Sequence, residues 1–353
     1  MNTRALNTVA FSAAALLVGL AAAGPLQPPA GPVAPAMKTL TEIEPRTPLT
    51  AAAFPGDADS VIKITQPGTY YLTADVVGAP GKSGIEIAAS NVTIDLNGFQ
   101  VRGVANSLMG VVVSLNGAND IALSNGSINH WGGSGFEGVT VSSFRTRLLN
   151  VNATDNGNCG FRLYRNSQAV NCNADGNATI GFDVYSYCAI TNCQANNNGL
   201  NGIDTAGGTT VSNCVASGNT AAGIHSTGGL VVGCAANNNR IAGIQAVNNC
   251  TVRDNNCAGN NMVADAAGII VSGSDCRIEG NNCTNNNRGV WVQASGNIVF
   301  RNTCSSNSLN WSLVANNVYG PIIDRTAPAS AAVSGNSASS SLGSTDANAN
   351  FTY

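Results

Sequence analysis

The 353-residue chain is 44% hydrophobic but only 10% charged and 5% aromatic, and it contains 40 glycines. Lysine and arginine together number 16 against 19 acidic residues, so the net charge of −3 provides no strong positive field for binding nucleic acid. This uniform composition predicts one repetitive architecture rather than two unrelated domains.

Residues 1–23 have the pattern of a secretory signal peptide. Arg4 precedes an apolar stretch from Val9 to Leu20, and three alanines follow at 21–23. The alternative is an uncleaved membrane anchor. We expect an exported protein, extracellular or periplasmic, with no membrane contact once the signal is removed. Residues 24–60 are rich in proline and are expected to form a linker.

A short motif then recurs: glycine, an apolar residue, any residue, and usually another apolar residue. Its copies lie on average roughly 20 residues apart, a period typical of solenoid proteins. A second short apolar segment, such as AVNCNA or AITNCQA, accompanies the copies in the middle of the chain. Both segments are too short for helices. The copies begin at Gly84, Gly110, Gly138, Gly160, Gly181, Gly202, Gly223, Gly243, Gly268 and Gly289, with Asn310 in place of glycine in the eleventh.

Repeats of this length and type predict an all-β fold, a right-handed parallel β-helix of about eleven coils over residues 84–314. Successive coils would stack at the inter-strand spacing of about 4.8 Å. Valine, isoleucine, alanine and cysteine would fill inward columns, and asparagine and glycine would occupy turns with positive φ. We expect residues 61–83 and 315–353 to cover the two ends, because open ends would expose unpaired backbone groups.

Seven of the 11 cysteines recur about once per coil and are expected to form one buried column. Side chains stacked at about 4.8 Å point the same way, which favours free thiols over disulfides or a metal site. The sequence has no CxxC pair and only two histidines, His130 and His225, so no metal site is predicted. The seven are Cys172, Cys193, Cys214, Cys234, Cys257, Cys283 and Cys304.

With these repeats, residues 61–314 resemble the secreted bacterial parallel β-helix proteins that include pectate lyases, polygalacturonases, alginate epimerases and carbohydrate-binding relatives. The resemblance implies the fold, since the repeat is shared by enzymes and non-enzymes. IGFDVY, at 180–185, resembles an alginate-epimerase motif, but the motif's Tyr and His are replaced by Ile180 and Tyr185. A polygalacturonase's paired DD and GHG are absent, and the coils lack lysine for a lyase base. No specific enzyme family is matched.

If the residue after each glycine points inward, the next one points outward. The outward residues of four successive coils are Arg162, Asp183, Asp204 and His225. As a carbohydrate site, adjacent Asp183 and Asp204 could share a proton and supply a general acid, and His225 could transfer a proton. Arg162 would bind a sugar carboxylate. The alternative interpretation is that these charges form exposed ion pairs that keep the face soluble.

Aromatic side chains nearby are candidates for packing against sugar rings. Tyr164 and Tyr185 lie two places beyond Arg162 and Asp183, and Trp131 lies in the loop NHWGGSGFE, which could wall a groove. The alternative for Trp131 is packing onto the solenoid. No cofactor is predicted, apart from calcium at the turn NCNADGN, whose twelfth position is Phe182 instead of glutamate.

The leading function is therefore binding of a polysaccharide or cell-envelope glycan by a monomer. The first alternative is a polysaccharide-processing hydrolase, lyase or epimerase, and the second is a structural or adhesive envelope protein. A concave groove around Arg162, Asp183, Asp204 and His225 would favour sugar binding over a structural role.

Overall fold

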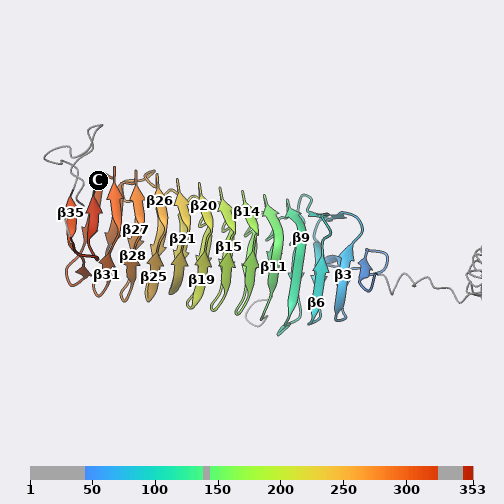
Figure 1. The fold of residues 1–353 in the computed structure, drawn as a ribbon. Coiled ribbons are helices and arrows are strands. Elements are labelled where there is room, and N and C mark those ends of the chain that lie inside the picture. Colours follow the sequence, from blue (N-terminus) through green and yellow to red (C-terminus); the bar gives the residue numbers. More distant parts are fainter. Residues whose placement is uncertain (1–43, 138–143, 325–344, 353) are drawn as a thin grey trace, which may run out of the picture. The chain divides into compact units, whose positions relative to one another are not determined.

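A computed structural model describes residues 44–137, 144–324 and 345–352. Arg46–Tyr353 form one compact unit, distinct from Met1–Pro45. The predicted signal peptide and residues 24–43 of the predicted linker lie outside the described residues. The described parts contain strands and no helix, hence none that could cross a membrane. The strands of successive coils lie side by side along a parallel β-helix with three faces (Figure 1), which confirms the predicted fold class.

Face 1 is a sheet of twelve parallel strands, one from each coil. It contains one coil more than the eleven repeats, because residues 61–83, expected as a cover, begin within a strand that pairs like the others. The strands of face 1 are β2 (Ser60–Ile64), β5 (Ser83–Ile87), β8 (Val111–Val113), β10 (Phe136–Glu137), β12 (Phe161–Leu163), β15 (Phe182–Val184), β18 (Ile203–Thr205), β21 (Ala222–Ser226), β24 (Ala242–Ala246), β27 (Ala267–Val271), β30 (Arg288–Val292) and β33 (Leu309–Leu313).

Face 2 continues each coil after a corner and is also parallel throughout. Its first strand, Thr47–Leu49, belongs to the predicted linker yet pairs with Tyr70–Leu72. The strands of face 2 are β1 (Thr47–Leu49), β3 (Gly68–Leu72), β6 (Val92–Asp95), β9 (Ile121–Asn129), β11 (Arg147–Thr154), β13 (Gln168–Val170), β16 (Ala189–Thr191), β19 (Thr209–Ser212), β22 (Gly229–Val232), β25 (Cys250–Arg253), β28 (Arg277–Glu279), β31 (Ile298–Phe300) and β34 (Val318–Tyr319).

Face 3 completes each coil before the chain returns to face 1. The long strands β9 and β11 extend across both face 2 and face 3. The other strands of face 3 are β4 (Val76–Val77), β7 (Gln100–Arg102), β14 (Asn173–Asp175), β17 (Gln194–Asn196), β20 (Val215–Ser217), β23 (Ala235–Asn237), β26 (Asn256–Ala258), β29 (Asn282–Thr284), β32 (Thr303–Ser305), β35 (Ile322–Asp324) and β36 (Asn350–Thr352).

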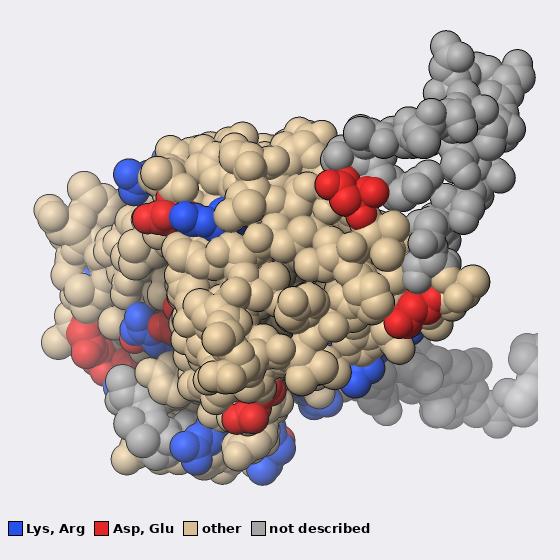
Figure 2. Space-filling model, turned by 90° about the vertical axis from the view of Figure 1, so that its left-hand side faces the viewer, with Lys and Arg blue, Asp and Glu red and all other residues tan. Residues whose placement is uncertain are grey.

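The core is a set of columns in which similar side chains stack from coil to coil. In β12, for example, Phe161 and Leu163 are fully buried and Arg162 between them points outward. The Phe161 ring stacks on Phe182 of the next coil, with ring centroids 5.0 Å apart. Charged groups are sparse and scattered on the surface that Figure 2 shows. Burial of the apolar columns, at roughly 25 cal/mol per Å², is the main stabilising term.

A buried asparagine ladder runs along the corner between face 3 and face 1. Each Nδ2 donates to Oδ1 of the asparagine one coil further on, at 3.0–3.2 Å, and that Oδ1 also accepts the backbone N–H. The Nδ2 group also donates to a backbone carbonyl of an earlier coil. The amides thus satisfy backbone groups that water cannot reach. The ladder consists of Asn156, Asn177, Asn198, Asn219, Asn239, Asn260, Asn286 and Asn307.

The prediction that asparagine and glycine occupy positive-φ turns is confirmed for the residue that precedes many ladder positions. Gly176 (φ 66°) and Asn197 (φ 53°) precede Asn177 and Asn198. The ladder asparagines themselves are absent from the positive-φ positions and serve as hydrogen-bonding groups.

All 11 cysteines are buried and free, as predicted for the seven of the expected column, but these seven occupy two columns. Cys172, Cys193, Cys214 and Cys234 stack at the corner between faces 2 and 3. Cys257, Cys283 and Cys304 instead continue a column of alanines, two residues further along the coil. The single-column prediction was wrong because a shift of two residues keeps a side chain on the inward side of a strand.

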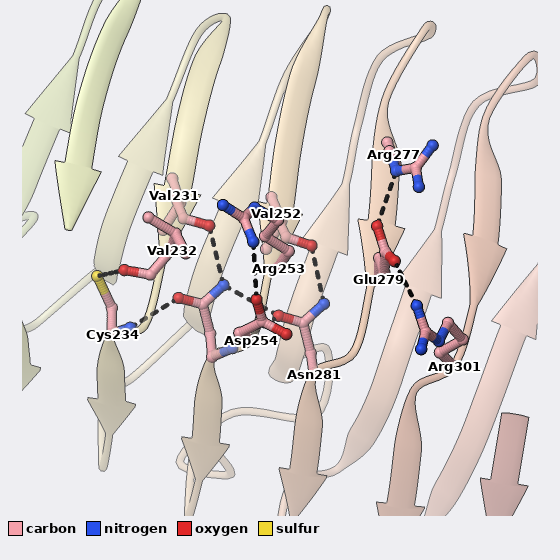
Figure 3. A network of polar contacts seen from close by, with 11 residues as sticks. Val231, Val232, Cys234, Val252, Arg253, Asp254, Arg277, Glu279, Asn281 and Arg301 are labelled. Carbon is pink, nitrogen blue, oxygen red and sulfur yellow. Dashed lines mark hydrogen bonds and ion pairs between the residues drawn. The ribbon is translucent and has the colours of Figure 1, made fainter. Parts of the chain in front are cut away.

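The corner column shows why cysteine suits these positions. The Sγ atom of Cys193 accepts the backbone N–H of Cys172 at 3.4 Å and donates to the carbonyl of Thr191 at 3.3 Å. After Cys234, asparagine takes the place of cysteine in this column, starting with Asn255, whose Oδ1 accepts the Cys234 N–H at 2.8 Å. Figure 3 shows the column from Cys234 to Asn281. Asn281 continues the column and donates to the carbonyl of Val252. Cysteine here acts as a weak polar partner as well as a small apolar side chain.

Alkylation of the native protein with iodoacetamide, in the absence of reductant, is expected to modify few or none of the cysteines, because all are buried. After unfolding in denaturant, still without reductant, mass spectrometry should detect eleven modified thiols. Pairs of cysteines that stay unmodified until a reductant is added would contradict the free-thiol columns.

Candidate functional site

The outward residues of face 1 form one column that follows the solenoid. Strand register aligns neighbouring members of this column on successive coils. Its polar middle, from Glu137 to His225, is the candidate site and is called the face 1 strip below. The complete column is Lys63, Glu86, Val112, Glu137, Arg162, Asp183, Asp204, His225, Gln245, Ile270, Trp291 and Ser312.

Glu137 is a member that the sequence analysis placed in a loop. The repeat expected at Gly138 would put Thr140 in the column, but β10 pairs Glu137 with Val112 on one side and Arg162 on the other. Residues 138–143 lie outside the described residues. The sequence signal was available, since GFE at 135–137 matches GFR at 160–162 and GFD at 181–183.

Arg162 joins two acids of neighbouring coils. Its Nε donates to Asp183 at 2.8 Å and its Nη1 to Glu137 at 3.0 Å, while Nη2 lies 3.5 Å from the sulfur of Cys159. The side chains of Arg162 and Asp183 are only 23% and 24% exposed, so the pair is partly shielded from water. Every guanidinium nitrogen has a protein partner, which does not support the expected role of Arg162 as a clamp for a sugar carboxylate.

Asp204 and His225 form a second pair on the next two coils. Asp204 Oδ1 lies 2.8 Å from Nδ1 of His225, and its Oδ2 accepts a hydrogen bond from Asn201 at 2.9 Å. Burial raises the pKa of Asp204, but the hydrogen bond and charge of His225, together with the hydrogen bond from Asn201, outweigh it and leave this pKa below its usual range. The hydrogen bond to Asp204 raises the pKa of His225, although burial opposes it.

These contacts change the expected chemistry of the two aspartates. Asp183 and Asp204 are register neighbours, as predicted, but each is bonded to a different basic side chain. A lowered pKa keeps Asp204 ionised at neutral pH, so it does not hold the shared proton that a general acid would need. His225, whose pKa the hydrogen bond to Asp204 raises, is the group of the site suited to exchange a proton.

Of the two tyrosines beside the face 1 strip, only one has a solvent-exposed ring. Tyr164 and Tyr185 stack with ring centroids 4.5 Å apart and an interplanar angle of 29°. Tyr164 is 5% exposed and its burial raises its pKa to about 12, whereas Tyr185 is 42% exposed. Tyr164 therefore packs against the Tyr185 ring, and the exposed Tyr185 remains available to pack against a sugar.

Trp131, expected to wall a groove, lies inside the protein. It is 1% exposed, and its Nε1 donates to the carbonyl of Val101 at 2.9 Å. The ring fills space left by Gly78 and Gly84, where an added Cβ would lie 2.7 and 2.8 Å from ring atoms. It cannot present a face to a sugar in this arrangement, so its predicted binding role is corrected to a packing role.

Trp291, at the other end of the column, was not singled out from the sequence. The guanidinium of Arg288 lies 3.9 Å from its ring centroid, and the ring packs beside the buried Ile270. Trp291 stands two residues after Gly289, as Asp183 stands two residues after Gly181, so the repeat could have identified it as an outward residue.

One group of three acids lies close enough together to hold a cation within the described parts of the chain. Oxygens of Asp57, Asp59 and Glu86 lie within 4.8 Å of one another. The ammonium of Lys63 already contacts Asp57 at 2.6 Å and Glu86 at 2.8 Å, which supplies a positive charge without a metal. At the turn considered for calcium, Asp175 lies in β14 and its Oδ1 accepts a hydrogen bond from Asn197 at 3.0 Å.

Comparison with known proteins gives similarity in structure alone. No family model and no curated protein sequence matches the chain. The A-modules of the Azotobacter vinelandii mannuronan C-5 epimerases AlgE4 and AlgE6 superpose with TM-scores of 0.52 and 0.54, at 15% and 16% identity. These alignments cover 72% and 71% of this chain and 91% and 89% of the modules.

The Dettilon tailspike protein matches with a TM-score of 0.57 and 14% identity, over 75% of this chain and 60% of the tailspike chain. The structural similarity establishes the parallel β-helix fold, as the sequence resemblance implied. At identities this low it does not transfer an activity to this chain.

The Asp204–His225 pair predicts a specific pH dependence. The raised pKa of His225 gives stability that is complete below its ordinary pKa of 6.5 and is lost as the pH rises through the folded value. The lowered pKa of Asp204 gives stability that is present above 3.8 and is lost as the pH falls through its folded value. The variant Asp204→Asn should therefore lose about 1 kcal/mol of unfolding free energy at about pH 5.5 and less at about pH 8.5.

Titration of the His225 ring by NMR provides the direct measurement. Its pKa should lie above 6.5 in the wild type and fall in Asp204→Asn. Equal His225 pKa values in the two proteins would contradict the pairing.

Proposed function

We propose that the protein binds a polysaccharide on the outer side of face 1, outside the cell. The observation that carries the proposal is the placement of an exposed aromatic ring, Tyr185, directly after the strand of Asp183, next to the Asp204–His225 pair on the following coils. Tyrosine packs against the apolar face of a sugar ring, and carboxylate and imidazole groups hydrogen-bond to hydroxyls.

The repeat geometry favours an extended ligand. Because each coil contributes one outward residue at intervals of about 4.8 Å, a chain lying along the solenoid can meet equivalent positions on successive coils. The face 1 strip contains three acids and one arginine, and that arginine forms ion pairs with Glu137 and Asp183. These groups favour contacts with sugar hydroxyls over contacts with anionic groups.

The structural neighbours add limited support. Two of them are named as epimerases of mannuronan, a polysaccharide, and a third is a tailspike protein. The similarity of fold is compatible with carbohydrate binding by this chain, and the residues of face 1 carry the proposal.

A second candidate, catalysis on the bound polysaccharide, rests on the Asp204–His225 hydrogen bond of 2.8 Å. A carboxylate bound to Nδ1 orients an imidazole and raises its basicity, which leaves Nε2 as the atom that would exchange a proton with a sugar. Such a role fits a lyase or an epimerase better than a two-carboxylate hydrolase, because Asp183 is paired with Arg162 and Asp204 stays ionised.

A glycan array on the full chain, followed by titration of each hit, tests the proposal. We expect at least one polysaccharide to bind, and both Tyr185→Ala and Asp204→Asn to weaken that binding roughly tenfold, the value of one good contact. The matched control is Asp254→Asn, which removes an exposed acid of another face whose left-handed backbone (φ 58°) asparagine tolerates.

If both Tyr185→Ala and Asp204→Asn keep full affinity, binding at this site is refuted. If the protein binds no glycan, a structural or adhesive role in the cell envelope is favoured. Each hit is then incubated with the protein and assayed for new reducing ends, unsaturated sugars and changed sugar configuration. Product formation that His225→Gln abolishes would support the catalytic candidate.

A further inference from the structure

A polar cavity lies around the corner from the face 1 strip. It has a volume of about 310 Å³ and is lined by Asp120, Arg145, Arg147, Asn166 and Gln168, at the corner that leads into face 2. Strand register aligns Arg147 with Gln168 on neighbouring coils, and the residues two places earlier, Arg145 and Asn166, follow the same alignment.

Positive charge is concentrated here although the chain as a whole carries −3. Arg145 binds Asp120 through two hydrogen bonds of 2.8 and 2.9 Å. Arg147 is exposed and makes no side-chain hydrogen bond or ion pair with the described residues. Arg165, also exposed, lies on the adjacent coil, and its carbonyl accepts the backbone N–H of Arg145 at 3.3 Å. The cavity is therefore lined by two guanidinium groups and one carboxylate, and the guanidinium of Arg147 is available to a ligand.

An exposed tyrosine, Tyr187, lies at the same corner one coil beyond Asn166. Arg145, Asn166 and Tyr187 occupy the same corner position on successive coils, with φ of 62°, 59° and 63°. Left-handed backbone recurs at this corner on coils before and after these, as at Asp120 and Asn249, so it is a property of the turn, and arginine and tyrosine are unusual occupants of it. Tyr187 is 65% exposed, and its ring lies over Gly208, where a Cβ would be 2.6 Å from a ring atom.

The corner connects the two surfaces through two tyrosines. Tyr185 and Tyr187 flank Ser186, so one exposed ring lies beside the face 1 strip and the other lies at the corner, one coil beyond Asn166 of the cavity. A polysaccharide on face 1 could therefore extend over Tyr185 and Tyr187 toward Arg147 without a change of fold.

We propose that this cavity is a subsite for an anionic group, a carboxylate or a sulfate, carried by the polysaccharide. Arg147 supplies the planar pair of donors that such groups accept, the amides of Asn166 and Gln168 add further donors, and Tyr187 packs against the sugar ring. Asp120 holds Arg145 as part of the cavity wall. The inference rests on the proposed function and narrows it to glycans with acidic substituents, bound by Arg147 and not by Arg162.

Binding of the full chain to polygalacturonate, dextran sulfate and neutral dextran, titrated at low and at high salt, tests the subsite. At low salt, Arg147→Gln should weaken binding of the preferred anionic polymer roughly tenfold and reduce its salt dependence. Arg240→Gln removes the same charge from an exposed arginine elsewhere on the solenoid and should leave binding unchanged. Equal melting temperatures of the two variants would show that folding is not responsible.

The outcomes separate this subsite from the proposed function. Binding to polygalacturonate alone assigns a carboxylate, binding to dextran sulfate alone assigns a sulfate, and binding to both assigns either anion, provided that Arg147→Gln weakens it. Equal losses in Arg147→Gln and Arg240→Gln, or none in either, would overturn the subsite. Glycan binding restricted to uncharged polymers would overturn the subsite but leave the proposed function standing, and binding to no glycan would refute both.

Discussion

The structure depends on the hydrogen bonds that pass from one buried asparagine to the next along the corner between faces 3 and 1. A three-sided coil must turn its backbone inside the protein, where peptide groups cannot reach water and would otherwise remain unpaired. Asn177, Asn198 and Asn219 supply both donors and acceptors at that turn, and each bonds to its counterpart in the next coil. The ladder thereby fixes the register between coils. A slip of one residue would break it and also turn inward side chains outward.

Fixed register is what converts a repetitive sequence into a surface with distinct sites. Arg162, Asp183, Asp204 and His225 each lie one full repeat apart in the chain, yet they meet because their strands align residue by residue. The same rule places Arg147 beside Gln168 around the corner. The two surfaces have opposite electrostatic character: on face 1 the acids engage the only arginine of the strip, whereas at the corner one arginine stays free. A single stacking rule thus places hydroxyl-binding and anion-binding groups next to each other.

Repeat spacing was sufficient to predict the fold, the burial of the cysteines and the adjacency of Asp183, Asp204 and His225. What it could not supply was decided by side-chain geometry in three dimensions. Spacing cannot tell that Asp204 turns to His225 rather than to Asp183, or that two glycines open a slot for Trp131. The cysteine column divided because positions two residues apart both point inward. The loop before Glu137 hid its place in the column, although GFE had the right form. The asparagine ladder also had a sequence signal, because its members recur once per repeat, but asparagine was interpreted only as a turn former.

The unfolding free energy of Asn219→Ala, compared with that of Thr220→Ala, tests the central role of the ladder most directly. Asn219 accepts from the backbone and side chain of Asn198 and donates to the carbonyl of Ala195, all within the protein. Thr220 is its exposed neighbour. We predict a loss of roughly 3–5 kcal/mol for Asn219→Ala, because buried donors and an acceptor lose their partners at about 1–3 kcal/mol each. For Thr220→Ala the change should stay within about 0.5 kcal/mol. Similar, small losses in both variants would contradict the account.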